Sequence, residues 1–167
     1  MTEPYRTIVA DPPWLERGGG KIKRGADRHY PLLSTSEIIR VMLQADQWRP
    51  DPAGAHLYLW VTNNFLPDGL EVMKALGFRY ITNIAWCKDR IGLGQYFRGQ
   101  HELCLFGVMG RLMTDIKPPT VVQAPRRRHS KKPPEFMEII ERASPLPRLE
   151  LFSRRARPGW TAWGNEV

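Results

Sequence analysis

Hydrophobic and polar positions along the chain follow two periods, and each period predicts one type of element. Short apolar runs rich in β-branched residues predict buried strands, whereas apolar residues three and four positions apart predict helices. The first apolar run is Thr7 to Ala10, and Pro12 and Pro13 follow it closely. Because prolines cannot donate to a sheet ladder, the chain must leave the sheet there. We therefore predict a first buried strand that ends beside Asp11.

The remaining pattern predicts alternating strands and helices, which is typical of a layered α/β fold. Ser34 to Glu37 has the spacing of a capping box and predicts a helix start. The expected elements are a helix ending near Trp48, a strand at 56–62, a helix from Pro67 that stops at Gly77, strands at 81–88 and 101–109, a helix after Pro133 and a strand at 149–154. The strands at 81–88 and 101–109 are joined by one loop, which favours an antiparallel extension at one edge of the sheet.

The end of the first strand carries candidate chemistry, because ligands of open α/β sheets bind at the carboxyl ends of strands. The exocyclic amine of a nucleic-acid base is a poor nucleophile, since its lone pair is delocalised into the ring. The carboxylate of Asp11 and the carbonyl oxygen of Pro12 can hold the amine hydrogens and aim that lone pair at a methyl donor. Pro13 restricts the backbone, and Trp14 offers a ring that can stack on the base. The alternative is a proline-stopped strand with a packed tryptophan.

The tetrapeptide Asp11-Pro12-Pro13-Trp14 resembles the signature of amino-group methyltransferases that act on nucleic-acid bases. Its tryptophan indicates a resemblance to the MT-A70 family of adenine-N6 methyltransferases. The resemblance runs from about residue 7 to 166 and is closest at 8–14, 56–62, 130–145 and 149–166. It implies a Rossmann-like fold with a mostly parallel sheet and helices on both faces. It also implies a permuted motif order, with the catalytic strand first and the cofactor strand last.

The same resemblance implies S-adenosyl-L-methionine as the methyl donor and assigns residues to it. Asp11 lies beside the donor, and Lys132 contacts its methionine carboxylate. The adenosine pocket and the ribose hydroxyls are assigned to the last part of the chain: Glu150, Phe152 and Arg154 for the pocket, and Asn165 and Glu166 for the hydroxyls. Carboxylate and amide acceptors suit a ribose diol. The acidic residue that some relatives carry upstream of the signature has no counterpart, so the two alternatives are weaker cofactor binding and completion of the cofactor site by a partner.

For the substrate side, the resemblance places Trp60 near the floor of the active site and Tyr30 where an aromatic residue closes a loop near the base. Residues 15–30 are rich in glycine and basic residues, and we expect a mobile lid there. The alternative for this segment is an ordinary surface loop. A core position is the alternative for Trp60.

Charge favours a polyanionic partner, since the net charge is +8 and the isoelectric point is about 9.9. The strongest basic segment is 126–132, and it precedes a predicted helix start, where cations are locally unfavourable. We assign Arg126, Arg127 and Arg128 to nucleic-acid phosphates, with a solvated surface as the alternative. A second mixed segment carries Arg90, Tyr96, Phe97 and Arg98, which suits gripping a backbone and propping an extruded base. Glu102 is expected only as a supporting group.

Length and composition bound the remaining options. A chain of 167 residues is expected to form a single domain. No apolar run approaches a membrane span and no basic-then-apolar leader precedes Ile8, so we expect no membrane association and a cytoplasmic location. Cys87 and Cys104 are expected as buried reduced thiols. The four histidines show no metal-ligand spacing, so we expect no metal.

These observations predict an enzyme that transfers a methyl group from S-adenosyl-L-methionine to the N6 amine of adenine in nucleic acid. DNA is the first choice of substrate because a compact, basic chain resembles bacterial or phage members. RNA is the alternative within the enzyme class. A catalytically inactive nucleic-acid-binding partner subunit is the alternative outside it, although such partners degrade the signature that is intact here. The basic run argues against a small-molecule methyltransferase. We expect a monomer or homodimer, with a partner subunit as a further option.

Overall fold

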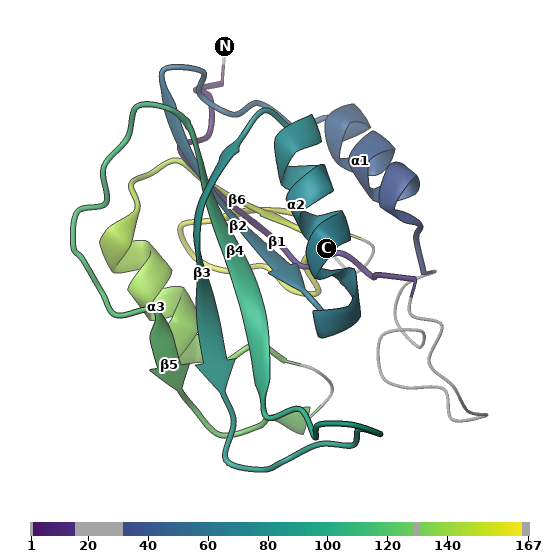
Figure 1. The fold of residues 1–167 in the computed structure, drawn as a ribbon. Helices are drawn as coiled ribbons and strands as arrows, with labels where there is room; N and C mark the ends of the chain where they lie inside the picture. Colours follow the sequence, from purple (N-terminus) through teal and green to yellow (C-terminus); the bar gives the residue numbers. More distant parts are fainter. Residues whose placement is uncertain (1, 16–31, 129–130, 165–167) are drawn as a thin grey trace.

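The computed structural model describes residues 2–15, 32–128 and 131–164. Seven strands in this part of the chain form one sheet in the order β5-β3-β4-β2-β1-β6-β7 (Figure 1). The strands are β1 (Thr7–Ala10), β2 (Gly54–Val61), β3 (Arg79–Cys87), β4 (His101–Gly110), β5 (Val121–Gln123), β6 (Arg148–Leu151) and β7 (Thr161–Trp163). The helices are α1 (Thr35–Gln44), α2 (Leu66–Ala75) and α3 (Pro134–Ala143), with the short 3-10 helix η2 (Asn63–Phe65) before α2.

The sheet is mostly parallel, as predicted. β1 lies between β2 and β6 and runs parallel to both, β6 is parallel to β7, and β3 is parallel to β5. β4 alone runs antiparallel to its neighbours, β2 and β3. The expected antiparallel pairing of β3 with β4 is therefore present near one end of the sheet. β5 lies outside that pair and was not predicted, because its three residues are too few to show a period.

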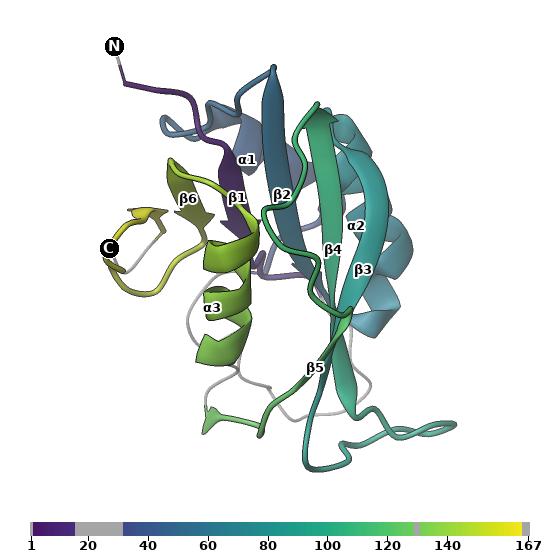
Figure 2. The same cartoon turned by 90° about the vertical axis from the view of Figure 1, so that its left-hand side faces the viewer.

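Helices cover both faces of the sheet. Figure 2 shows α3 on one side and α1 and α2 on the other. In β1, Ile8 and Ala10 pack in the cluster under α1 and α2, whereas Val9 packs in the cluster under α3. In β2, Leu59 and Trp60 divide in the same way. Burial on both faces explains why the strands read as continuous apolar runs, and it confirms the Rossmann-like α/β class.

The helix boundaries follow local signals. The capping box at Ser34 is formed, with the Ser34 hydroxyl accepting from the Glu37 amide and the Glu37 carboxylate accepting from the Ser34 amide. α1 ends at Gln44, four residues before the predicted end at Trp48, because Ala45 has extended backbone. Gly77 follows α2 with φ +84°, a conformation that glycine adopts without strain, and it ends the helix as predicted.

This topology gathers several chain segments at one edge of the sheet. β1, β2, β3 and β6 all point the same way, so the residues that follow them lie at their common carboxyl end. Because β4 runs in the opposite direction, its first residues also lie at that edge. The segment after β1 is held there by Leu33, whose amide donates to the Pro13 carbonyl and whose carbonyl accepts from the Leu15 amide. No helix in the described ranges is long and apolar enough to cross a membrane.

Candidate active site

Asp11 is the first residue after β1 and stands at the carboxyl edge of the sheet. Its side chain remains 39% exposed, and its Oδ2 lies 3.5 Å from the Nζ of Lys132. Lys132 comes from the segment that leads into α3, on the sheet face opposite α1 and α2. Partial burial at the strand ends raises the pKa of Asp11, and the attraction of Lys132 only partly offsets this. The structure thus places the signature acid beside a cation.

Lys132 is shared between two carboxylates, and the second belongs to Glu102. The Nζ of Lys132 lies 3.1 Å from Glu102 Oε1, and Glu102 Oε2 lies 2.8 Å from the Nζ of Lys88. Asp11, Lys132, Glu102 and Lys88 therefore form a chain of alternating charges, which we call the charge chain. Its two acids and two bases balance formally, which lets four ionisable groups gather at the strand ends.

The charge chain fixes the ionisation of its inner members. Burial opposes the charge of Glu102, but Lys132 and Lys88 outweigh it and lower the pKa of that carboxyl. Burial likewise opposes the charge of Lys132, but Asp11 and Glu102 outweigh it and raise the pKa of the ammonium. Near neutral pH, Glu102 is an anion and Lys132 is a cation. The ammonium next to Asp11 is consequently a permanent feature of the site.

Two buried tryptophans lie under the ammonium groups. The Nζ of Lys132 is 4.9 Å from the ring centroid of Trp60, and the Nζ of Lys88 is 4.9 Å from that of Trp86. The ring of Phe136 in α3 lies 4.5 Å from Trp60. Cation–π contacts of this kind favour the charged form of a lysine over a packed aromatic layer. The aromatic layer therefore supports the charge chain from below.

The two prolines shape the turn after Asp11. The backbone N–H of Trp14 donates to the carbonyl of Pro12 over 3.0 Å, which closes a three-residue turn around Pro13. The ring of Pro13 fixes φ near the value that such an inverse γ-turn requires. The Pro12 carbonyl lies outside the sheet ladder, as predicted, although the Trp14 amide occupies one of its lone pairs. A carbonyl oxygen can accept a second hydrogen bond, so Pro12 retains capacity for a ligand.

The position of Trp14 corrects one prediction. The side chain is only 4% exposed, its ring stacks on Phe65 at 5.6 Å, and its Nε1–H donates to the Trp60 carbonyl over 2.9 Å. A ring buried on these contacts cannot present a face to an incoming base. Trp14 instead locks the turn to β2, which positions Asp11 and Pro12.

Trp60 and Tyr30 are the other residues assigned to the substrate side. Trp60 is buried under Lys132 and lies beneath the charge chain, and its role in substrate binding stays a prediction. Tyr30 lies outside the described residues, as does the expected lid at 15–30 apart from Leu15.

The cofactor residues of β6 are only partly placed as predicted. Phe152 directly follows β6 with φ +60°, a strained conformation for a residue with a side chain. Its ring is buried and lies 5.6 Å from the ring of Trp163, and its place in the adenosine pocket stays a prediction. The positive charge of Arg154 contributes to lowering the pKa of Asp11, and its contact with the cofactor stays a prediction. Asn165 and Glu166 lie outside the described residues.

Glu150 carries a feature that fits a ligand. Burial raises the pKa of its carboxyl, and the Nε of Arg157 lies 3.8 Å from its Oε2. That Oε2 atom is buried and accepts no hydrogen bond within the described part of the chain. Because buried acceptors are normally satisfied, this oxygen is suited to a hydroxyl or amine donor supplied by a bound molecule.

The basic segment lies beside the same edge. Arg126, Arg127 and Arg128 are exposed, and Arg127 pairs with Glu135 at 3.6 Å. The backbone N–H of Arg126 donates to the Asp89 carboxylate over 2.8 Å, which ties this segment to the residue after Lys88. The contact of these arginines with phosphate remains a prediction.

Sequence reasoning gave too little weight to Glu102 and missed Lys88. Both residues flank the loop between two predicted strands, and that flanking position was the available signal. Antiparallel pairing brings the end of β3 beside the start of β4, with Cys87 opposite His101. Glu102 lies opposite Trp86 in that ladder, so Lys88 and Glu102 are diagonal neighbours, a spacing that long side chains of opposite charge can bridge.

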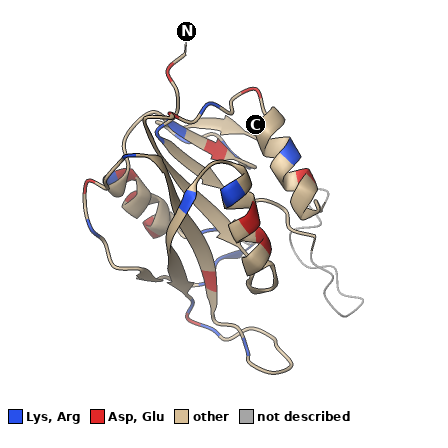
Figure 3. Cartoon of the chain, turned by 45° about the horizontal axis from the view of Figure 1, so that its top comes forward, with Lys and Arg blue, Asp and Glu red and all other residues tan. Residues whose placement is uncertain are grey.

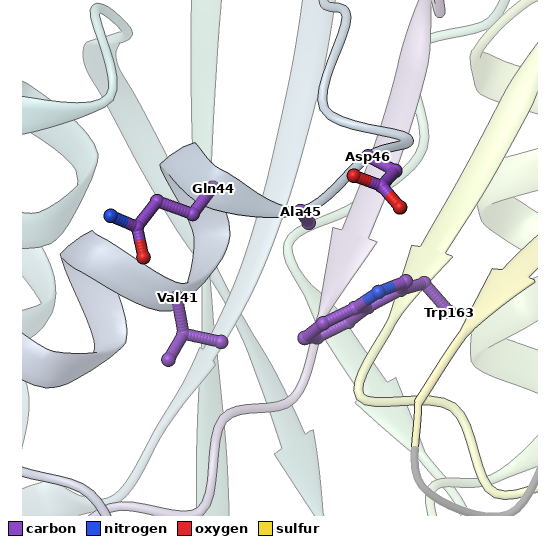
Figure 4. A pocket seen from close by; sticks show the side chains of 5 residues that line it. All are labelled: Val41, Gln44, Ala45, Asp46 and Trp163. Carbon is purple, nitrogen blue, oxygen red and sulfur yellow. The ribbon is translucent and has the colours of Figure 1, made fainter.

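The described residues also line two open pockets away from Asp11. One, of about 320 Å³, is lined by Leu15, Ser34, Thr35, Asn64 and Phe65. The other, of about 240 Å³, lies between the end of α1 and Trp163 of β7 (Figure 4). Neither is lined by Asp11. Leu15 follows Trp14 in the chain and Phe65 stacks on the Trp14 ring. Both residues line the first pocket, which therefore adjoins Trp14.

Comparison with known proteins decides the family. The MT-A70 family model matches residues 5–166, nearly the whole chain. The chain belongs to the MT-A70 family. Among similar proteins, a probable N(6)-adenosine-methyltransferase MT-A70-like protein of Oryza sativa subsp. japonica is 30% identical over 98% of this chain and 23% of its own length. The human N(6)-adenosine-methyltransferase catalytic subunit METTL3 is 30% identical over 98% of this chain and 28% of its own.

A third relative has a different size. The type II methyltransferase M.MunI of Mycoplasma sp is 28% identical over 98% of this chain and 78% of its own length. The chain spans about a quarter of the plant relatives that it matches. This MT-A70 chain therefore corresponds to one segment of those proteins and to most of M.MunI.

Proposed function

We propose that this MT-A70 protein transfers a methyl group from S-adenosyl-L-methionine to the N6 amine of adenine in nucleic acid. The observation that carries the proposal is the placement of Asp11 and Pro12 at the carboxyl end of β1, beside the cation of Lys132. The names of the Oryza and human relatives support the N6 position of adenine.

In this reaction the adenine amine is the nucleophile, and the protein holds it in place without supplying a nucleophile of its own. Asp11 accepts one amine hydrogen, and the Pro12 carbonyl accepts the other on its remaining lone pair. Both acceptors are preorganised by the turn around Pro13 and by the packing of Trp14. They draw the nitrogen lone pair out of the ring plane, which is the change that the transition state requires.

The cofactor fits the residues present. S-adenosyl-L-methionine, when bound, supplies an electrophilic methyl group. Lys132 has three donors, of which Asp11 and Glu102 occupy two, so one remains for the methionine carboxylate. Glu150 and Arg154 would hold the adenosine part, with the Oε2 of Glu150, which accepts no hydrogen bond in the described part of the chain, as an acceptor. Asn165 and Glu166 stay assigned to the ribose hydroxyls.

Proton removal does not demand a strong base. Once the nitrogen has gained the methyl group it is cationic and acidic, so its proton can leave to Asp11 or to water. Burial already raises the pKa of Asp11, which makes it a better acceptor than an ordinary aspartate. The positive charge of Lys132 keeps Asp11 available as an anion beforehand.

We propose DNA as the preferred nucleic acid and adenosine in RNA as the alternative. The match over 78% of a type II methyltransferase supports DNA, whereas the adenosine methyltransferases are matched over about a quarter of their lengths. A partner that completes the cofactor site remains part of this proposal.

The test is labelled-methyl transfer to matched single-stranded DNA, double-stranded DNA and RNA oligonucleotides, with the product identified by nucleoside mass spectrometry. We expect N6-methyladenine, with the highest yield on one of the DNA substrates. Transfer to RNA alone would overturn the DNA preference. Absence of transfer to all three, with a cofactor-loaded protein, would overturn the proposed activity.

A further inference from the structure

The loop between β3 and β4, residues 88–100, begins and ends beside the charge chain. Its first residue, Lys88, and the second residue of β4, Glu102, are both members of that chain. The backbone N–H of Lys88 donates to the Gln100 carbonyl over 2.8 Å, and the side-chain Nε2–H of Gln100 donates to the Lys88 carbonyl over 2.9 Å. The base of the loop is therefore fixed to the candidate active site. Figure 1 shows the loop extending beyond the sheet.

The outer part of this loop is braced by its own atoms. The Gly92 amide donates to the Gly99 carbonyl over 2.7 Å, and the Arg98 Nε–H donates to the Gly92 carbonyl over 2.9 Å. These bonds close residues 92–99 into a small ring of chain. Hydrogen bonds within the loop thus stabilise the conformation of its tip, and its aromatic side chains do not pack against the sheet or the helices.

Two neighbouring aromatic side chains stand at the tip. Tyr96 is 96% exposed and Phe97 is 94% exposed, the highest values among the exposed large hydrophobic residues of the described chain. A soluble domain usually buries part of each aromatic ring. Two almost fully exposed rings on a braced loop are suited to binding a ligand that has flat apolar faces.

Cations accompany these rings. Arg90 and Arg98 lie on either side of them in the chain, and both are exposed. The Asp89 carboxylate accepts from the Arg126 amide, and that hydrogen bond is the main cause that lowers the pKa of Asp89. The loop is thereby joined to the basic residues 126–128. Figure 3 shows basic positions along the loops at this end of the sheet.

We propose that Tyr96 and Phe97 stack on unpaired bases next to the target adenine, while Arg90 and Arg98 contact the adjoining phosphates. This inference rests on the proposed function and names the element that binds the flanking nucleotides. Aromatic rings flanked by cations match the chemistry of a single strand, whose bases offer π faces and whose backbone is anionic. A protein partner would instead favour an aromatic core depleted of charge, whereas here the basic segment 126–128 is tied to the base of the loop.

The experiment measures binding of the full chain to a fluorescein-labelled single-stranded oligonucleotide by fluorescence anisotropy. The variant Y96A/F97A should bind roughly tenfold or more weakly than the wild type, because each base–aromatic stack is lost. The matched control is Leu93→Ala, which removes another exposed apolar side chain from the same loop. This control should bind like the wild type.

A second oligonucleotide, with abasic sites on both sides of the target adenine, separates base stacking from electrostatic attraction to the phosphate backbone. The wild type should bind it about as weakly as Y96A/F97A binds the intact strand, and the variant should lose little more. Equal binding of variant and wild type to the intact strand would overturn the inference. So would unchanged binding together with a changed oligomeric state, because that outcome assigns the rings to a protein contact. If the wild type neither binds nor methylates any oligonucleotide, the proposed function fails instead.

Discussion

Replacing Lys132 by methionine tests the charge chain, because it removes the cation and keeps a side chain of similar length. The loss leaves Asp11 without its ion-pair partner and leaves Glu102 with Lys88 alone, 2.8 Å away. Breaking a buried ion pair from one side costs about 3 to 5 kcal/mol. The side chains of Lys132, Asp11 and Glu102 are 17%, 39% and 24% exposed, so water screens part of that cost. We expect a loss of about 1 to 3 kcal/mol in the free energy of unfolding.

Urea denaturation at pH 7 measures this change, and Lys131→Met is the matched control. Lys131 is the adjacent lysine and is exposed, so its replacement should stay within about 0.5 kcal/mol of the wild type. A loss of 2 kcal/mol would lower the melting temperature by about 4 to 8 °C in a domain of this size. Equal stability of the two variants would refute the account of the charge chain.

The same variant should change the pH dependence of methyl transfer. Without the attraction of Lys132, the pKa values of Asp11 and Glu102 rise. Because the mechanism needs Asp11 as an anion, the acid limb of the rate profile should move to higher pH in Lys132→Met. An acid limb that stays in place would show that Asp11 does not set it.

Two further predictions concern buried groups. His56 is fully buried, and its ring bonds to Ser144 and to the Leu112 carbonyl; burial, partly offset by the Leu112 bond, lowers its pKa. The unfolded chain therefore takes up a proton below about pH 6.5 that the folded protein resists. Stability should fall as the pH decreases from 7 to 5, and the slope should be smaller in His56→Gln. Trp14→Phe removes the bond to the Trp60 carbonyl and should lower stability by about 1 to 2 kcal/mol in urea denaturation. Unchanged stability with lost activity would instead return Trp14 to a contact with the base.

Much of the fold could be predicted because the strongest signals are local. The capping box at Ser34, the glycine at 77 and the apolar run before Pro12 each determine backbone geometry within a few residues. β5 and the end of α1 were not predicted correctly, because a three-residue strand and an extended Ala45 depend on tertiary contacts. Boundaries of this kind are set by packing rather than by sequence period.

In the candidate site, too, local features could be predicted from the sequence and long-range contacts could not. The exit of the chain from the sheet after Asp11 is a local consequence of two prolines, so it could be predicted from the sequence. The charge chain joins residues that are 91 positions apart in the case of Asp11 and Glu102, and only the sheet topology brings them together. The sequence likewise could not show that Trp14 is buried, because a tryptophan after a strand is equally compatible with packing and with base stacking.

The central claim is that Asp11 at the end of β1 holds the amine that receives the methyl group. The most direct measurement compares the wild type with Asp11→Asn in single-turnover transfer of labelled methyl to an adenine-containing oligonucleotide. The substitution keeps the size of the side chain and removes its charge. We predict that the rate falls at least roughly a hundredfold, while the variant still folds and largely retains cofactor binding. A variant that retains most of its rate would contradict the account.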